Sequence, residues 1–342
     1  MNNSHIVFPA EWYPQSGVQI TWPHSNTDWV DILDEVTTCY ISFSKEILKR
    51  EKLLIVCASE ADVLKHFTSE EKKNIITIEV SSNDTWARDH GPISVFKNGV
   101  PAIIDFGFNG WGLKFAANLD NQITNKLHSQ EEYNSNVRYI NRIDFILEGG
   151  AIESDGEGTL LTTSQCLLAP NRNQPMNQSE IEEYLINTLG IERILWLDHG
   201  YLAGDDTDSH IDTLARFCSR DTIAYVSCED RDDEHYDELK KMEDELKSFR
   251  TINKEPYNLI PLPMADMVIN DGYRLPATYA NFLIINGAVL MPTYSSPKDE
   301  IAKQQLQKAF PNYEIIGIDC QSLIKQHGSL HCVTMQLPEG FI

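Results

Sequence analysis

A hairpin signal recurs along this chain and restricts its fold more than any other feature. Runs of β-branched and aromatic residues turn back at Asn98-Gly99, Asp155-Gly156 and Asn286-Gly287, and a less regular run turns near Arg220-Asp221. Asn-Gly and Asp-Gly are strong hairpin signals because both turn residues need positive φ angles, which Asn, Asp and Gly tolerate. The sequence therefore predicts hairpins at intervals along the chain.

A short polar motif precedes each hairpin. The motifs are Arg88-Asp89-His90-Gly91, Glu148-Gly149-Gly150, His210-Ile211-Asp212 and Thr278-Tyr279-Ala280-Asn281, and His331-Cys332 stands before a final β-type run. From Asp89 through Glu148, Asp212 and Asn281 to Cys332, the successive intervals are 59, 64, 69 and 51 positions. Blocks of about 68 residues suit a strand–strand–helix–strand module. Modules arranged around an axis would bring all five motifs to one central site in an α/β protein.

The remaining patterns fit the helices and strands of such modules. The sequence predicts a short strand over 18–22, a helix over 31–50, a buried strand over 53–57, a charged helix over 229–249 and a helix over 298–310. The apolar stripe of the charged helix is typical of ordinary core packing.

Charge and composition exclude several classes of protein. The net charge of −23 argues against nucleic-acid binding and suits either a cationic ligand or a solubilising acidic surface. No apolar run approaches the ~20 residues of a membrane helix, and no signal peptide is visible at the start. Seven scattered cysteines suit reduced thiols in a cytoplasm. We expect a cytoplasmic protein without a membrane or nucleic-acid partner; the sequence leaves its oligomeric state open, a homo-oligomer included.

The motifs together offer a thiol, an imidazole and three carboxylates, namely Cys332, His210, Asp89, Glu148 and Asp212. Carboxylates beside a thiol raise its pKa, because a thiolate there meets like charge. A cationic substrate would counteract that field. A guanidinium fits best, since it is planar and pairs bidentately with carboxylates, which would also orient its carbon for attack. The pattern predicts a cysteine nucleophile that acts on a small cationic guanidine.

Two histidines compete for the acid/base role. If residues 210–212 are extended, His210 and Asp212 project on the same face, whereas His331 on a strand would point away from Cys332. We therefore expect His210 to act rather than His331. Taken singly, these residues have simpler interpretations: a hydrogen-bonded structural histidine, a buried inert thiol, an Asp89 that pairs with its neighbour, and a Glu148 that closes a turn.

A metal site is the main rival interpretation. Residues 206–212 alternate Asp, Asp, His and Asp as in a calcium loop, but the sixth position is Ile211 rather than Gly and the twelfth is Phe217 rather than Glu. The sequence contains no Cys-x-x-Cys and no His-Glu-x-x-His zinc motif. It also lacks a P-loop and a Gly-x-Gly-x-x-Gly segment. We expect no metal and no cofactor.

The chain resembles the agmatine deiminases, within the bacterial-type peptidyl-arginine deiminase family. The segments that carry the resemblance are 86–92, 148–150, 159–163, 204–212 and 331–334, with further agreement at 105–112 and 171–173. This resemblance implies a five-bladed α/β-propeller, the pentein fold, as a single guanidine-modifying domain over residues 1–342. It also implies Cys332 as nucleophile, His210 as general acid/base, and Asp89, Glu148 and Asp212 as partners of the guanidinium or the histidine.

The implied reaction hydrolyses agmatine to N-carbamoylputrescine and ammonia through a thiouronium intermediate on Cys332. We expect Trp86 and Trp111 to wall the alkyl chain, and Asp206 and Asp208 to attract the distal ammonium. The chain departs from the family over 326–329, where Gln-His-Gly-Ser replaces the usual Gly-Gly-Gly-Asn. Alternatives are a deiminase of free or peptide-terminal arginine, an amidinotransferase of the same fold, and a non-catalytic guanidine- or metal-binding protein.

Overall fold

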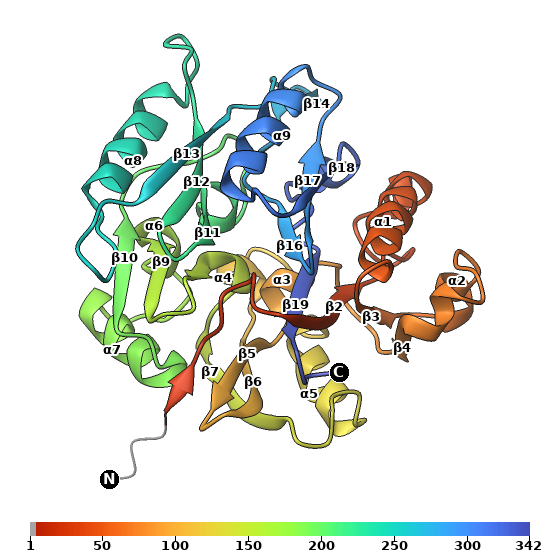
Figure 1. Ribbon diagram of the computed structural model, residues 1–342. Helices are drawn as coiled ribbons and strands as arrows, with labels where there is room; N and C mark the ends of the chain where they lie inside the picture. Colours follow the sequence, from red (N-terminus) through yellow and green to blue (C-terminus); the bar gives the residue numbers. More distant parts are fainter. Residues whose placement is uncertain (1–4) are drawn as a thin grey trace.

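The computed structural model describes residues 5–342, and the strands of this part of the chain form six separate sheets. Five sheets share one plan, in which the first strand pairs antiparallel with the second and the second pairs parallel with a third. Figure 1 shows these five sheets spread around a central region. The predicted α/β class and its five modules are confirmed, although no sheet closes on itself.

Four modules lie in the middle of the chain. Their strands are β5 (Ile93–Lys97), β6 (Val100–Gly107) and β7 (Arg138–Ile146); β8 (Ile152–Ser154), β9 (Thr159–Thr163) and β10 (Arg193–Leu197); β11 (Ala215–Ser219), β12 (Thr222–Ser227) and β13 (Asn258–Pro263); and β16 (Leu283–Ile285), β17 (Ala288–Thr293) and β18 (Glu314–Asp319). The short β1 (Ile6–Val7) adds to the edge of β5. A two-stranded ribbon of β14 (Ile269–Asn270) and β15 (Tyr273–Arg274) stands apart from the modules.

The fifth module joins segments from opposite ends of the described chain. Strand β19 (Thr334–Pro338) pairs antiparallel with β2 (Gln15–Thr21), with Thr334 opposite Ile20. Strands β3 (Lys52–Cys57) and β4 (Ile75–Glu79) continue the sheet in parallel. The strands predicted over 18–22 and 53–57 are therefore present, and they belong to the same sheet.

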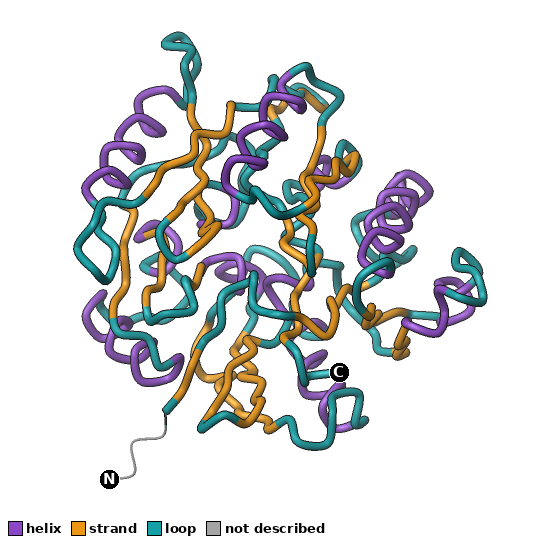
Figure 2. The backbone as a smooth tube through the Cα atoms, in the orientation of Figure 1, coloured by secondary structure: helices purple, strands orange, loops and turns teal. Residues whose placement is uncertain are grey.

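Helices cover the outside of the modules, and two short helices lie near the centre (Figures 1 and 2). The outer helices are α1 (Leu33–Leu48), α2 (Glu60–Leu64), α5 (Ile123–Ser129), α7 (Gln178–Leu189), α8 (Tyr236–Ser248) and α9 (Lys298–Ala309). The central ones are α3 (Ala87–His90) and α4 (Gly110–Leu113), and α6 (Ser164–Leu167) follows β9. The stripe of the charged helix packs inward as predicted, since α8 buries Leu239, Met242 and Leu246.

Sequence signals explain where α7 begins and ends. Its first turn carries a capping box, in which Asn177 accepts a hydrogen bond from Glu180 N and Glu180 accepts one from Asn177 N. These bonds satisfy backbone groups that the start of a helix leaves unpaired. The helix ends at Gly190, whose φ of 70° lies in the left-handed region that terminates helices.

The hairpin turns agree with the prediction in place but not always in conformation. Asn98 and Gly99 both have positive φ, as a two-residue type I′ turn requires. At Asn286-Gly287 only the glycine has positive φ. Asn286 instead binds the N-terminal segment, because its Nδ2 donates to Gln15 O and its Oδ1 accepts from Gln15 N. Tertiary hydrogen bonds have decided the geometry of that turn.

Three clusters of buried apolar side chains form the interior, and the largest includes residues of β2, β3, β11, β12, β16 and β17. The packing of inner strands against outer helices fixes where each strand starts, and therefore where each polar motif lies. Within residues 5–342, none of the helices has the length and apolar character that crossing a membrane requires.

Candidate active site

The polar motifs occupy short turns that lead into the first strand of each module. Asp89 lies in α3 before β5, Glu148 precedes the 3₁₀ turn η4 (Gly149–Ala151) before β8, and His210 precedes η5 (Ile211–Thr213) before β11. Cys332 lies two residues before β19. Two details of the prediction are wrong: His331 does not lie on a strand, because β19 begins at Thr334, and residues 210–212 are not extended. Tight turns, rather than strand alternation, aim these side chains inward.

The thiol of Cys332 lies between an amide and a carboxylate. Its Sγ is 3.4 Å from Oδ1 of Asn281, to which it donates, and 3.9 Å from Oδ2 of Asp212. The same Asn281 oxygen accepts hydrogen bonds from the backbone N–H groups of His331 and Cys332. Burial, together with the charges of Asp212 and Asp89, raises the pKa of Cys332 well above its ordinary value. As the sequence predicts, the neighbouring carboxylates disfavour the Cys332 thiolate, and a bound cation would counteract their charge.

Asp89 faces His210 across the site. Its Oδ1 lies 3.6 Å from Nδ1 of His210 and accepts a hydrogen bond from Gly150 N at 3.0 Å. Burial raises the pKa of Asp89 to about 6, although His210 opposes that effect. Burial alone would lower the pKa of His210, but Asp89, Cys166 and Glu148 outweigh it and raise the pKa to about 10. A protonated imidazole therefore stands beside these acidic groups near neutral pH.

Several polar atoms at the centre of the site lack hydrogen-bond partners. Among the described residues, Oδ1 of Asp212 and both ring nitrogens of His210 are buried and unpaired. Buried polar groups are normally satisfied, and leaving one unpaired costs about 1–3 kcal/mol. Three such atoms next to a thiol indicate a place that a polar ligand fills.

Gly150 leaves room for this convergence. A Cβ atom built on it would lie 2.6 Å from Nδ1 of His210 and 2.8 Å from Oδ1 of Asp89, closer than real Cβ contacts. Its backbone conformation is not left-handed, so the glycine is needed for space. The Glu-Gly-Gly motif marked this position in the sequence.

Trp111 links the aromatic wall to the acidic centre. Its Nε1 donates to Oδ2 of Asp89 at 3.0 Å. Its φ of 56° lies in the left-handed region, which a bulky residue rarely adopts and which costs of order 1–3 kcal/mol. The flanking Gly110 and Gly112 also have positive φ. Such strain is typical of functional sites, where the surrounding structure holds a side chain in one orientation.

His331 occupies a buried position that the sequence did not reveal. Its Nδ1 lies 2.7 Å from Oδ2 of Asp212, and its Nε2 lies 2.7 Å from Oε2 of Glu11. Both ring nitrogens are therefore engaged, so His331 has no lone pair free for the thiol. Glu11 also pairs with Arg216 at 2.8 Å. The favourable charges outweigh burial and hold the pKa of Glu11 well below its usual range. Nothing in the sequence around Glu11 signalled this role.

Glu148 and Asp208 face a common partner, Arg172. The Nε atom of Arg172 lies 3.1 and 3.2 Å from the two oxygens of Glu148, and its Nη1 lies 2.6 Å from Asp208. Asp208 also binds Lys114 at 2.7 Å. The expectation that Asp208 contacts the substrate is therefore corrected: its carboxylate is held by two cations, and it does not line the pocket. Arg172 was overlooked because a lone arginine has no spacing signal.

A pocket of about 150 Å³ opens beside Cys332. Its walls include Trp86, Trp111 and Phe115, which are aromatic as predicted. The lining also includes four carboxylates outside the thiol's immediate surroundings, from Asp28, Asp84, Asp205 and Asp206. No lysine or arginine is among its lining residues. The pocket therefore combines a thiol, apolar walls and negative charge.

Two of those four carboxylates already accept hydrogen bonds from the protein. Asp84 accepts from Thr85 N and from Trp29 Nε1, and Asp205 accepts from Thr207 N and Ser209 N. Asp28 is exposed at the pocket, and Asp206 lies 3.8 Å from Nδ1 of His327. The negative charge that remains available to a ligand is thus concentrated on Asp28 and Asp206.

Residues 7–338 match the profile of the Porphyromonas-type peptidyl-arginine deiminases. The chain belongs to this family. A curated relative, the agmatine deiminase of Pseudomonas aeruginosa (strain LESB58), is 33% identical over 96% of this chain and 95% of its own length. The family resemblance stated from the motifs is thereby confirmed.

Solved structures of the same family superpose closely on this chain. A proposed arginine deiminase from Porphyromonas gingivalis is 55% identical, with a TM-score of 0.96 over 98% of this chain and 99% of that one. A cysteine-to-serine variant of the C. jejuni agmatine deiminase with substrate bound is 39% identical, with a TM-score of 0.93 over 100% of this chain and 99% of that one. A dimethylarginine dimethylaminohydrolase structure shares the fold at 11% identity and a TM-score of 0.51. The mixed α/β fold is thus shared with solved deiminases and with this hydrolase.

Proposed function

We propose that this family member is an agmatine deiminase, which hydrolyses agmatine to N-carbamoylputrescine and ammonia with Cys332 as nucleophile. One observation carries the proposal: the pocket joins the Cys332 thiol to apolar walls and free carboxylates, without a cation among its lining residues. Relatives that are named agmatine deiminases support it. The convergence of motifs from every module also supports a single catalytic domain over residues 1–342.

The guanidinium would occupy the acidic centre, where its charge serves the nucleophile. Asp89 and Asp212 lie on the thiol's side of the site, and Asp212 Oδ1 is unpaired. A bound guanidinium satisfies that oxygen and offsets the negative field that keeps Cys332 protonated. Glu148, held by Arg172, acts from the side of His210.

The chemistry proceeds in two steps. The Cys332 thiolate adds to the guanidinium carbon, and the C–N bond to one terminal nitrogen breaks as His210 gives that nitrogen a proton, so ammonia leaves. The product of this step is a thiouronium bound to Cys332. Neutral His210 then takes a proton from water, the hydroxide adds to the same carbon, and the C–S bond breaks. Thiolate and protonated imidazole are restored, the O-protonated urea that leaves gives its proton to solvent, where the released ammonia can accept it, and the product is the neutral substituted urea.

The tail of the substrate distinguishes agmatine from arginine. Arginine carries a carboxylate that needs a cation or several N–H donors. The buried arginines near the site are not available: Arg216 pairs with Glu11 and Glu153, and Arg88 donates to Gln336 at 2.6 Å. Arg172 pairs with Glu148 and Asp208. Asp28 and Asp206 would repel a carboxylate and attract an ammonium. The lining therefore favours agmatine.

Arginine deiminase is the second candidate, favoured by the 55% identical P. gingivalis protein. Ammonia release from agmatine, free arginine and a peptide ending in arginine, measured in parallel, tests the choice. We expect kcat/KM for agmatine to exceed both rivals by about a hundredfold, which corresponds to ~2.7 kcal/mol. Equal or faster turnover of either rival would overturn the substrate while leaving the deiminase chemistry in place.

A further inference from the structure

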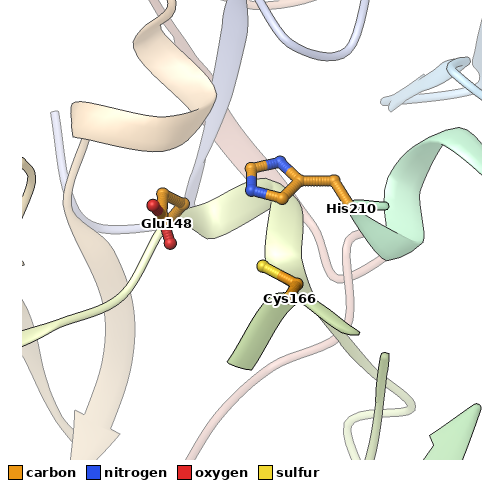
Figure 3. A group of neighbouring side chains, drawn as sticks. All are labelled: Glu148, Cys166 and His210. Atoms are coloured by element: carbon orange, nitrogen blue, oxygen red, sulfur yellow. The ribbon is translucent and has the colours of Figure 1, made fainter. Parts of the chain in front are cut away.

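A second thiol lies against the acid/base group, outside the pocket lining. Cys166 belongs to α6, and its Sγ, a carboxylate oxygen of Glu148 and a ring nitrogen of His210 all lie within 4.8 Å of one another. Figure 3 shows the three side chains converging from different segments, with Nε2 of His210 toward Glu148 and Cys166. We propose that Glu148, Cys166 and His210 form a binding site for a thiophilic divalent ion of the Zn²⁺ class.

The donor set matches that class of ion. Thiolate, imidazole and carboxylate are the ligands that Zn²⁺ takes in proteins, and three protein ligands leave a fourth position open. Ligand atoms around a tetrahedral Zn²⁺ lie about 3.3–3.8 Å apart, so binding needs movements of about 1 Å from the present separations. His210 is 1% exposed, and its Nε2 has no hydrogen-bond partner among the described residues. A buried, unpaired nitrogen aimed at a thiol and a carboxylate can bind the ion once its proton is displaced.

Hydrogen bonds of Thr163 fix the positions of the segments that carry Cys166 and His210. Thr163 Oγ1 donates to Ser209 O, next to His210, and accepts from the backbone N–H of Cys166. One side chain thus fixes the segments that carry the thiol and the imidazole. Such pre-organisation lowers the entropic cost of closing a site around an ion.

Arg172 does not block the ion. A carboxylate has about four lone-pair positions, and the Nε–H of Arg172 occupies only part of this capacity on Glu148. Metal-bound carboxylates usually accept such outer hydrogen bonds, which orient them. Glu148, a Cys166 thiolate and the neighbouring Asp89 supply three negative charges, so an ion with two positive charges remains compensated beside Arg172.

A second group of three donors lacks these properties. Glu11, Glu153 and His331 also bring ligand atoms within 4.8 Å of one another. Both nitrogens of His331 are already bound to carboxylates, and Arg216 pairs with both glutamates. The donor atoms of that cluster are therefore already paired with one another and with Arg216. In the His210 cluster, Nε2 of His210 has no hydrogen-bond partner among the described residues.

Occupation of the site would stop turnover, and this consequence rests on the proposed function. The ion would take the lone pair that His210 needs to accept a proton from water, and it would engage Glu148. Binding displaces the protons of Cys166 and His210 to solvent, so affinity should increase with pH. The site therefore predicts reversible inhibition by thiophilic ions that chelation relieves.

Cobalt(II) provides a readout that does not depend on activity. The experiment uses the full chain with Cys332→Ala, which removes the other thiol near the substrate, and titrates Co²⁺ while recording thiolate-to-cobalt charge-transfer absorption. We expect the band in Cys332→Ala and in the matched control Cys332→Ala/Cys218→Ala, which removes another buried cysteine. We expect its loss in Cys332→Ala/Cys166→Ala and in the less disruptive Cys332→Ala/Cys166→Ser.

Zinc inhibition completes the test. With Cys332 intact, Cys166→Ser should raise the Zn²⁺ concentration for half-inhibition at least tenfold, while Cys218→Ala leaves it unchanged. Absence of the cobalt band in Cys332→Ala, or its persistence after Cys166 is replaced, would overturn the site, and so would zinc inhibition that is equally strong in Cys166→Ser and in the parent. A cobalt band without zinc inhibition would support the metal site and count against the role of His210 in the proposed function.

Discussion

The Nε2 atom of His331 lies 2.7 Å from Oε2 of Glu11, a residue 320 positions earlier in the chain. The other ring nitrogen of His331 contacts Asp212 at the same distance. The imidazole next to Cys332 in sequence thus connects the N-terminal segment to Asp212. Its burial between two acids suits a positioning role, and in the proposed mechanism His210 transfers the proton.

Glu11→Gln should weaken both the fold and the reaction. Glu11 accepts from Ile284 N and pairs with Arg216 and His331, so removal of its charge leaves buried cations less compensated. We expect the free energy of unfolding in urea to fall by about 3 kcal/mol. We also expect kcat to fall more than KM rises, because Asp212 loses its orientation through His331. Glu46→Gln, which removes surface ion pairs, should change stability by no more than about 0.5–1 kcal/mol. Equal effects of the two substitutions would contradict the network.

Cys332→Ala should abolish turnover while the protein stays folded and still binds agmatine. Mass spectrometry of the parent protein quenched during turnover should find the substrate-derived adduct on Cys332. Cys228→Ala, a half-buried cysteine away from the pocket, should leave activity unchanged. An adduct on any other cysteine would remove Cys332 from the mechanism.

The rate at which Cys332 is alkylated should depend on the negative charges of Asp212 and Asp89. Burial, Asp212 and Asp89 raise the pKa of this thiol well above 9, so its reaction with iodoacetamide should keep accelerating beyond pH 9. Asp212→Asn removes one of these charges, which lowers the pKa and speeds alkylation near neutral pH. Asp237→Asn, on the exposed face of α8, is the control. An unchanged rate in Asp212→Asn would mean that its charge does not act on the thiol.

Substrate affinity should depend on the free carboxylates of the pocket. Asp28→Asn and Asp206→Asn are expected to raise KM for agmatine about two- to fivefold each, as partly exposed charge pairs allow, with kcat little changed. Asp31→Asn, on the neighbouring 3₁₀ turn η1 (Val30–Ile32), carries the same change in net charge and should have no effect. If the control matched the two variants, long-range charge rather than the pocket would explain affinity.

Stability should depend on pH through Asp120. Burial raises the pKa of Asp120 to about 7, although the N–H groups of Asn83 and Asp84 oppose the shift. The folded state then binds a proton more tightly than the unfolded chain, so this residue's contribution to stability falls as pH rises from about 4 to 7. In Asp120→Asn, the loss of stability between pH 5 and pH 8 should be smaller than in the parent, by urea denaturation at each pH. A larger loss would contradict the sign of the shift.

Local signals predicted the modules and the residues nearest the thiol. Asn98-Gly99 and the Glu148-Gly149-Gly150 motif have short-range causes, since turn geometry and close packing act within a few positions. The same reasoning failed for residues 210–212, which it treated as extended, because tertiary packing selected a 3₁₀ turn. The preference for His210 over His331 agrees with the geometry, although the reason given for it, strand alternation, does not hold.

The omissions share a physical cause. Glu11 and Arg172 act through partners that lie 320 and 24 positions away. A single acid or guanidinium carries no spacing pattern, and which partner it meets depends on how modules pack. For Asp208 the sequence was misleading. Its place near His210 in the sequence suggested a contact with the substrate, but its carboxylate pairs with Arg172 and Lys114.

The pairing of β19 with β2 also governs when this protein can become active during its synthesis. During synthesis β2 emerges from the ribosome early and β19 emerges last. The four central modules can therefore fold before β2 pairs with β19. Contacts of such long sequence separation form slowly. Because Cys332 and His331 directly precede β19, the proposed nucleophile lies in the last part of the chain to be synthesised. A nascent or truncated chain would hold the other acids and the imidazole of His210, and it would still lack a reactive centre.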